Sequence, residues 1–220
     1  MKERGMIFNG EMTRAILDGR KTQTRRPIKW KQTRFTEIGE REDGSSWPWS
    51  EDAEHACDFW HPCPFGAVGD RIWVREAFRV HSRATDVATL VYKASERNSW
   101  TEQTHRVPVA VCNKPATPEK WTPSLHMPRW ASRILLEITN VGVQRLQDIS
   151  SGDAVREGIC QLPASGRYCL SPGDQYFGGA SHSAKEVYSW LWSSIYGEES
   201  WKTNPWVWVI EFKRVEGGAA

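Results

Sequence analysis

The chain has 220 residues and a formal net charge of +2, with 39% hydrophobic and 25% charged residues. This composition is typical of a folded protein and excludes an intrinsically disordered chain. No apolar run approaches the roughly 20 residues that a bilayer span needs, and no signal peptide is evident. The five cysteines are scattered and odd in number, which argues against a disulfide framework. We therefore expect a cytoplasmic protein that does not associate with membranes.

The first elements in chain order are a strand, a helix and a second strand. Residues 5–8 are expected to form the first strand, and Asn9 is expected to cap a helix over residues 10–18. Gly19 ends this helix because glycine adopts the left-handed conformation that terminates helices. The strand expected over residues 22–26 follows at once.

Basic residues are concentrated in this second strand and just beyond it. The 18 residues from Gly19 to Thr36 contain no acidic residue and seven basic ones: Arg20, Lys21, Arg25, Arg26, Lys29, Lys31 and Arg34. In a chain of balanced charge, such a cluster indicates a place where an anionic or strongly polar ligand is held. Side chains alternate along a strand, so Thr22, Thr24 and Arg26 are expected to share one face, with Lys21 at the turn.

The remaining elements are mostly strands, with two further helices. Strands are expected over residues 71–80, 87–93, 107–111, 133–144 and 206–214. Ser150 and Asp153 have the spacing of a capping box and predict a helix that ends near Gly158. A last helix is expected over residues 185–196, with Val187, Trp190, Leu191 and Ile195 on one face.

Three segments lack sustained periodicity and are interpreted as long excursions from the core, over about 28–66, 94–128 and 160–182. The rest contains five or six strands and about three helices without strict alternation. This order favours a mixed α+β fold, a small, mostly antiparallel barrel or sheet with helices packed at its ends. We expect a single domain over residues 1–215 and a disordered tail over residues 216–220.

Two of the excursions suggest ligand sites. Basic and aromatic residues interleave as on a surface that binds single-stranded nucleic acid, which nominates Arg25, Lys29, Trp30, Lys31 and Arg34. The alternative is a solvated loop with a few buried aromatic residues. In the loop 121–130 the tryptophans are expected to pack, while His126 or Arg129 faces a ligand.

A metal site is not expected. Two histidines and two cysteines fall within nine residues: His55, Cys57, His61 and Cys63. Their spacing is tighter than that of zinc knuckles, and alternate residues of one short loop rarely complete a tetrahedron. We interpret them as loop residues and expect no cofactor.

Four segments together resemble the ASCH family, a branch of the PUA-like β-barrel proteins. They are Ile16–Arg26, Gly69-Asp70 leading into a strand, Leu146–Gly158 and Trp206–Lys213. The length and tryptophan content are similar to those of ASCH proteins carried by bacteriophages and prophages. The resemblance implies a PUA-like small barrel with a pocket for RNA, a nucleotide or a modified base.

One branch of that family hydrolyses the acyl-amide of N4-acetylcytidine with a lysine, a threonine and a glutamate. Matched through the motif, these are Lys21, Thr24 and Glu157. Amide hydrolysis without a metal needs a nucleophile, a base, an acid for the leaving amine and an oxyanion donor. Thr24, Lys21 and Glu157 supply the first three, provided that neighbouring Arg20, Arg25 and Arg26 lower the pKa of Lys21. The alternative role for Glu157 is to hold the amino edge of the cytosine.

The remaining substrate contacts are assigned to Arg20, Thr22, Arg26, His126 and Arg129, with Arg26 stabilising an oxyanion or a phosphate. Two other functions stay open at this point. One is a non-catalytic RNA-binding module of phage origin, and the other is a metal-independent ribonuclease, an activity reported for another ASCH branch. The sequence identifies no protein partner.

Overall fold

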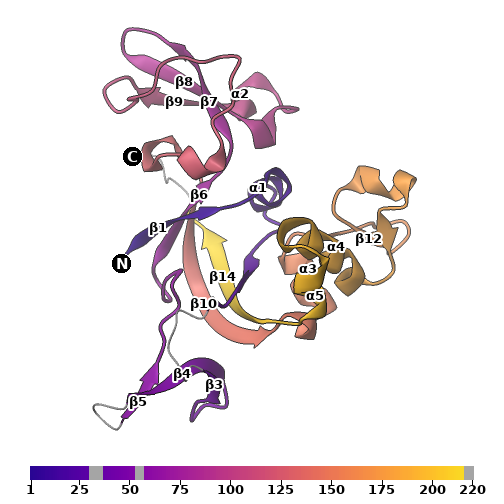
Figure 1. Ribbon diagram of the computed structural model, residues 1–220. Helices are drawn as coiled ribbons and strands as arrows, with labels where there is room; N and C mark the ends of the chain where they lie inside the picture. Colours follow the sequence, from indigo (N-terminus) through magenta and orange to yellow (C-terminus); the bar gives the residue numbers. More distant parts are fainter. Residues whose placement is uncertain (30–36, 53–56, 216–220) are drawn as a thin grey trace. The chain divides into compact units, whose positions relative to one another are not determined.

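The computed structural model describes residues 1–29, 37–52 and 57–215 (Figure 1). The chain divides into two compact units. The first comprises residues 1–19, 70–137 and the chain from 213 onward, and the second comprises residues 20–69 and 138–212. Within the described ranges, no helix is long and apolar enough to cross a membrane.

The first unit opens with strand β1 (Glu3–Ile7) and helix α1 (Gly10–Leu17). Asn9 caps the helix as predicted, since its side chain accepts a hydrogen bond from the Met12 backbone N–H at 2.8 Å. Gly19 follows the helix with a φ of 73°. β1 pairs in parallel with β6 (Arg71–Arg75), and β6 pairs antiparallel with the first residues of β10 (Leu135–Arg145).

A second sheet of this unit consists of β7 (Phe78–Arg83), β8 (Val87–Tyr92) and β9 (Thr104–Pro108), with the short helix α2 (Trp100–Gln103) before β9. The single strand predicted over residues 71–80 is therefore wrong. The chain leaves the first sheet at Glu76, whose buried carboxylate accepts hydrogen bonds from Arg133 at 2.9 and 3.1 Å, and then joins other partners.

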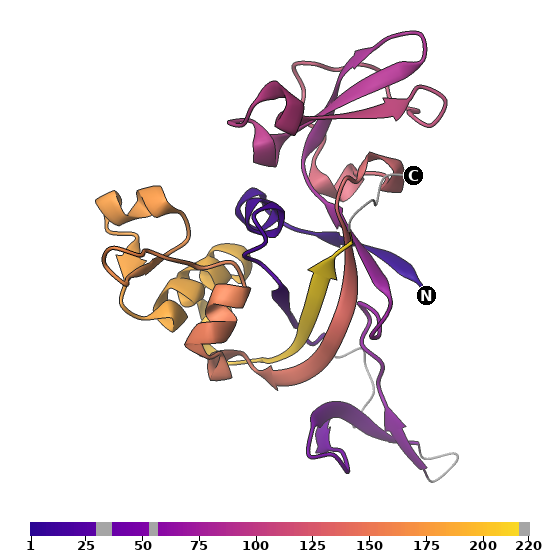
Figure 2. The ribbon, with the colours of Figure 1, turned by 180° about the vertical axis from the view of Figure 1, so that it is seen from behind.

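In the second unit, strand β2 (Gln23–Pro27) pairs antiparallel with β14 (Trp206–Arg214). β14 lies between β2 and the long curved strand β10, and Figure 2 shows β10 and β14 running side by side. β2 is the last strand of this sheet. Pro27, which has no N–H to donate, therefore ends an edge strand, where proline is tolerated.

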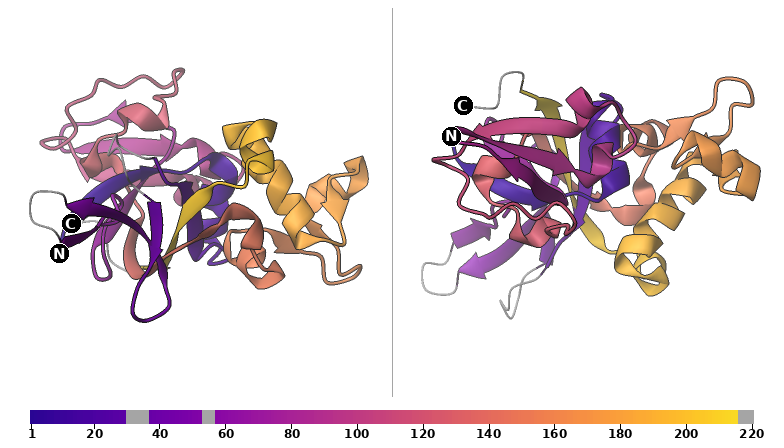
Figure 3. Two further views of the ribbon diagram at one scale, coloured as in Figure 1. Left: turned by 60° about the horizontal axis from the view of Figure 1, so that its bottom comes forward. Right: turned by 90° about the horizontal axis from the view of Figure 1, so that it is seen from above.

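Helices α3 (Ser151–Arg156), α4 (Ala184–Tyr196) and α5 (Glu198–Lys202) complete this unit and lie close together in Figure 3. α3 contacts both β2 and α4. The predicted apolar face of α4 is partly wrong, because Trp190 and Ile195 are exposed. Tyr188 and Trp192 are buried in their place beside Val187. Aromatic residues occur on both sides of this helix, so the pattern alone did not fix its buried face.

The excursion over residues 28–66 contains regular structure that the sequence did not indicate. Strands β3 (Glu37–Glu40), β4 (Ser46–Asp52) and β5 (Cys57–Trp60) form an antiparallel sheet. The Arg41 guanidinium lies 3.9 Å from the centre of the Trp47 ring, which meets Trp208 edge-on at 5.1 Å. Trp47 is thus held by contacts with a turn residue and with a strand of another sheet, and no pattern within its own strand reports them.

The excursion over residues 160–182 also forms a small sheet, of β11 (Cys160–Gln161), β12 (Tyr168–Cys169) and β13 (Ala180–Ser181). The prediction of a mixed α and β fold is thus confirmed, as are its three main helices. None of the sheets built by the described strands closes into a barrel. The PUA-like barrel and the single domain over 1–215 stay predictions, and the tail 216–220 lies outside the described residues.

Candidate functional site

The second unit brings Lys21 and Glu157 together in its interior. The Lys21 ammonium donates to Glu157 Oε2 and to the Glu157 backbone carbonyl, both at 2.7 Å. The Lys21 side chain is 0% exposed and that of Glu157 is 1% exposed. A buried pair of opposite charges with a further hydrogen bond is the arrangement in which such charges are tolerated away from water.

Glu157 reaches this position because α3 is fixed at both ends. Ser150 and Asp153 form the predicted capping box, with the Asp153 N–H donating to Ser150 Oγ at 3.0 Å. At the other end, Glu157 is the C-cap residue, and Gly158 has a φ of 105°. The Arg20 guanidinium donates to the Gly158 carbonyl at 2.8 Å, which ties the end of α3 to the start of β2.

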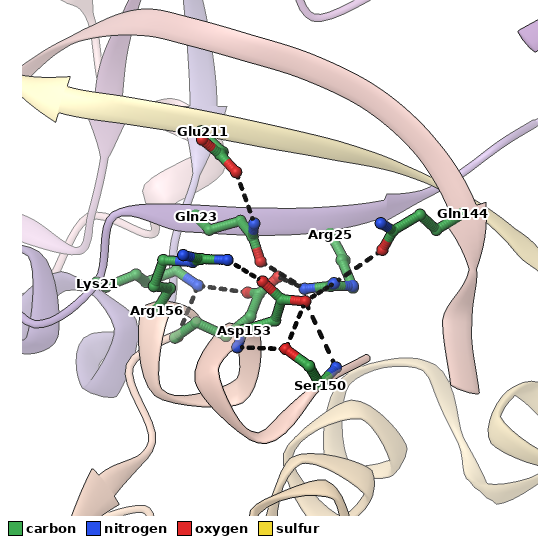
Figure 4. A network of polar contacts seen from close by, with 9 residues as sticks. Lys21, Gln23, Arg25, Gln144, Ser150, Asp153, Arg156 and Glu211 are labelled. Carbon is green, nitrogen blue, oxygen red and sulfur yellow. Dashed lines mark hydrogen bonds and ion pairs between the residues drawn. The ribbon is translucent and has the colours of Figure 1, made fainter. Parts of the chain in front are cut away.

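Arg25 lies at the centre of the polar network drawn in Figure 4. Its Nη1 donates to Glu157 Oε1 at 3.3 Å and to Gln23 Oε1 at 2.6 Å. Its Nη2 donates to Gln144 Oε1 at 3.2 Å and lies 3.4 Å from Asp153 Oδ2. The planar guanidinium therefore joins strand β2 to β10 and to α3.

Cations and carboxylates face each other throughout this network. Lys21 and Arg25 face the carboxylates of Glu157 and Asp153, and the exposed Arg156 makes a further ion pair with Asp153. The carboxylate of Glu157 is held by two cations, one at each oxygen. Such two-sided anchoring fixes the orientation of the carboxylate.

Thr24 lies beside this network with its side chain on the other side of the strand. Gln23 and Arg25 face α3, so strand alternation places the Thr24 side chain on the opposite face of β2. In the sheet, Thr24 lies opposite Ile210 of β14. Thr24 is 1% exposed. Among the described residues, no hydrogen bond joins the Thr24 hydroxyl to Lys21 or Glu157. A nucleophilic role for Thr24 therefore requires its side chain to turn toward Lys21 when substrate binds.

Burial is the main cause of the altered acidity of this site. It lowers the pKa of Lys21, an effect that Glu157 opposes and that Arg26 and Arg25 reinforce. The direction is the one predicted, although burial rather than neighbouring charge is the largest cause. Burial also raises the pKa of Tyr188 well above its ordinary value, and the charge of Glu157 adds to this effect.

The remaining predicted residues are distributed over both units. Arg26 Nη1 donates to the Tyr196 hydroxyl at 3.5 Å, and the Thr22 N–H donates to the Arg156 carbonyl at 2.9 Å. Lys29 is exposed, whereas Arg25, nominated for nucleic-acid binding, is buried inside the network. Trp30, Lys31 and Arg34 lie outside the described residues.

His126 and Arg129 belong to the first unit. His126 is exposed, and Arg129 Nε donates to Glu3 Oε2 at 2.9 Å. Their contact with a ligand stays a prediction.

Of the histidine and cysteine cluster, His55 lies outside the described residues. His61 Nε2 is 2.9 Å from Ser50 Oγ, Cys57 is exposed and Cys63 is buried. In the part of the chain that the structure describes, no three His, Cys, Asp or Glu side chains are grouped so as to hold a metal.

Sequence reasoning missed Gln23, Gln144 and Glu211 as members of the site. Gln23 Nε2 donates to Glu211 Oε1 at 3.2 Å, which extends the network to β14. A signal for Gln23 was present, because Lys21, Gln23 and Arg25 alternate along the strand as polar residues. Nothing local pointed to the residues from the other strands.

Comparisons of the chain with protein-family models, with curated proteins and with solved structures gave no match.

Proposed function

We propose that the protein is of the ASCH type, with a PUA-like fold, and that residues of its second unit hydrolyse the acyl-amide of an N4-acylcytidine-type nucleoside. The observation that carries the proposal is the buried contact of 2.7 Å between Lys21 Nζ and Glu157 Oε2. The motif that nominated Lys21, Thr24 and Glu157 supports the same assignment, because two of its three residues meet inside the protein.

The buried pair can supply a base and an acid at once. Moving one proton along the hydrogen bond converts the ammonium and carboxylate into an amine and a carboxylic acid. Burial disfavours the charged forms, and it lowers the pKa of Lys21, so it assists this transfer. The resulting amine accepts a proton, and the acid donates one.

In the proposed reaction, the Thr24 oxygen attacks the acyl carbon and gives its proton to the Lys21 amine. The C–N bond then breaks, and N4 takes the proton of Glu157, which releases cytidine and leaves an acyl ester on Thr24. The proton returns from Lys21 to Glu157. Water then attacks the ester, gives a proton to Lys21 and releases the carboxylic acid, while Thr24 regains its proton from Glu157. Arg26 is assigned to the oxyanion.

The placement of Arg25 favours this function over a non-catalytic RNA-binding surface. Arg25 is 3% exposed and donates a hydrogen bond to Glu157. It is therefore not accessible to a phosphate, unlike the exposed basic residues that a nucleic-acid surface needs. A residue whose two terminal guanidinium nitrogens are both engaged in the interior contributes to positioning rather than to phosphate binding.

The test is to incubate the protein with N4-acetylcytidine and to measure cytidine by chromatography. We expect product from the wild type and from Lys202→Met, a change at an exposed lysine of α5, but not from Lys21→Met or Thr24→Ala. Circular dichroism of each variant separates loss of chemistry from loss of folding. No product above the Thr24→Ala level overturns the proposal. Salt-sensitive RNA binding without turnover then supports the binding module, and metal-free cleavage of labelled RNA supports the ribonuclease.

A further inference from the structure

Cys160 and Cys169 are direct partners in the small sheet of the second unit. They lie opposite each other in the antiparallel ladder between β11 and β12, next to the pair Gln161 and Tyr168. Directly opposite residues in such a ladder have Cα atoms about 4.5–5.5 Å apart, which falls within the range that a disulfide spans. Both cysteines are free thiols in the structure.

The two thiols have different surroundings. Cys169 is fully buried in an apolar cluster with Leu162 and Ala180, and Cys160 packs against this cluster from its edge. Cys160 is partly exposed and can meet a small oxidant. Cys169 Sγ lies 3.8 Å from the Cys160 carbonyl oxygen, so the buried thiol is already directed at its partner strand.

We propose that Cys160 and Cys169 form a reversible disulfide when the protein meets a peroxide. The Cys160 thiolate attacks hydrogen peroxide, which oxidises it to a sulfenic acid and releases hydroxide. The Cys169 thiol then attacks the sulfenic sulfur, the S–S bond forms and water leaves. A dithiol reductant restores both thiols.

The disulfide lies three residues beyond Glu157. The chain between them is held by the hydrogen bond from Arg20 to the Gly158 carbonyl and by that from the Ile159 N–H to the Ala154 carbonyl at 3.2 Å. Oxidation therefore links the two ends of the segment 160–169 by a disulfide without requiring α3 to move. The proposal concerns the thiols alone and does not depend on the proposed activity.

The tryptic map of the chain makes the test direct. Trypsin cuts after Arg156, Arg167 and Lys185, so Cys160 and Cys169 fall in separate peptides, 157–167 and 168–185. The folded full-length protein is treated with hydrogen peroxide, free thiols are blocked with iodoacetamide, and the digest is analysed by mass spectrometry.

We expect a linked pair of these peptides whose mass is lower by two hydrogens than their sum and which separates on reduction. The linked pair should persist in Cys57→Ser, which removes an exposed thiol, and be lost in Cys169→Ala. Peroxide treatment in concentrated urea should reduce its yield, because the ladder that pairs the two cysteines is then gone. Recovery of both peptides alkylated, or of Cys160 linked to Cys57 or to a second chain, overturns the proposal.

Discussion

Lys21 Nζ lies 2.7 Å from Glu157 Oε2, although 136 residues separate the two in the chain. Both side chains are buried, and the Lys21 ammonium also satisfies the carbonyl of the residue with which it pairs. This contact closes the end of α3 onto the start of β2. The contact therefore holds α3 against β2, and it also forms the centre of the proposed active site.

Breaking this pair from one side should destabilise the protein. Among the described residues, Lys21→Met leaves the buried Glu157 carboxylate with Arg25 as its one cationic partner, and Glu157→Gln removes the anion that pairs with the buried Lys21 ammonium. We expect each to cost about 3–5 kcal/mol in the free energy of unfolding, measured by urea denaturation. The double variant Lys21→Met with Glu157→Gln should recover much of this loss. Additive losses would show that the two residues are not coupled.

Arg25→Lys should impair turnover more than substrate binding. A lysine keeps the charge but loses the fork that reaches Glu157, Gln23 and Gln144 together. A displacement of Glu157 by about 1 Å is expected to lower kcat by about 100-fold. The measurement is kcat and KM on N4-acetylcytidine, with Arg145→Lys, at an exposed arginine of β10, as the matched control. An increase in KM at unchanged kcat would instead make Arg25 a substrate contact.

The sequence predicted those parts of the fold that depend on local signals. Asn9, the pair Ser150 and Asp153, and Gly19 act within four residues of a helix end, and each was found in its predicted role. The sheet of β3, β4 and β5 was missed because its stability comes from cross-strand contacts such as Trp49 opposite Trp60. No pattern within one strand reports such a contact.

The candidate site was predictable only in part. The pairing of Lys21 with Glu157 was implied by a family resemblance, since no periodicity relates residues so far apart. Arg25 was predicted to bind nucleic acid because charged side chains usually lie at the surface. Its position two residues from Gln23 and four from Lys21 along the strand indicated instead that the three side chains share the inner face. Which of the two faces of an edge strand is covered by a helix is a tertiary property.

Ser150→Ala should loosen the helix that carries Glu157. The change removes the acceptor for the Asp153 N–H and one donor to the Asp153 carboxylate. We expect a loss of about 1 kcal/mol in stability, measured by urea denaturation. Ser189→Ala, at a partly exposed serine within α4, serves as the control and should change stability by less. Equal effects of the two substitutions would contradict a capping role for Ser150.

The activity should fall at high pH. The proposed chemistry needs one proton shared by Lys21 and Glu157, and that proton is lost when the pH rises through the pKa of Lys21. Burial lowers this pKa from its ordinary 10.5, so the fall in kcat/KM should be centred below pH 10.5. At low pH the pair takes up a second proton and the base is lost. A pH–rate profile checks this, and activity that continues to increase beyond pH 10.5 would contradict it.

The most direct test of the central claim is a crystal structure of the Thr24→Ala variant soaked with N4-acetylcytidine. The variant removes the proposed nucleophile, so the acyl group should remain intact. The account predicts the acyl carbon about 3–3.5 Å from the place of the missing Thr24 hydroxyl oxygen, with Lys21 within hydrogen-bond reach of that place. A nucleoside bound elsewhere on the molecule, with residue 24 buried and not in contact with it, would contradict the account.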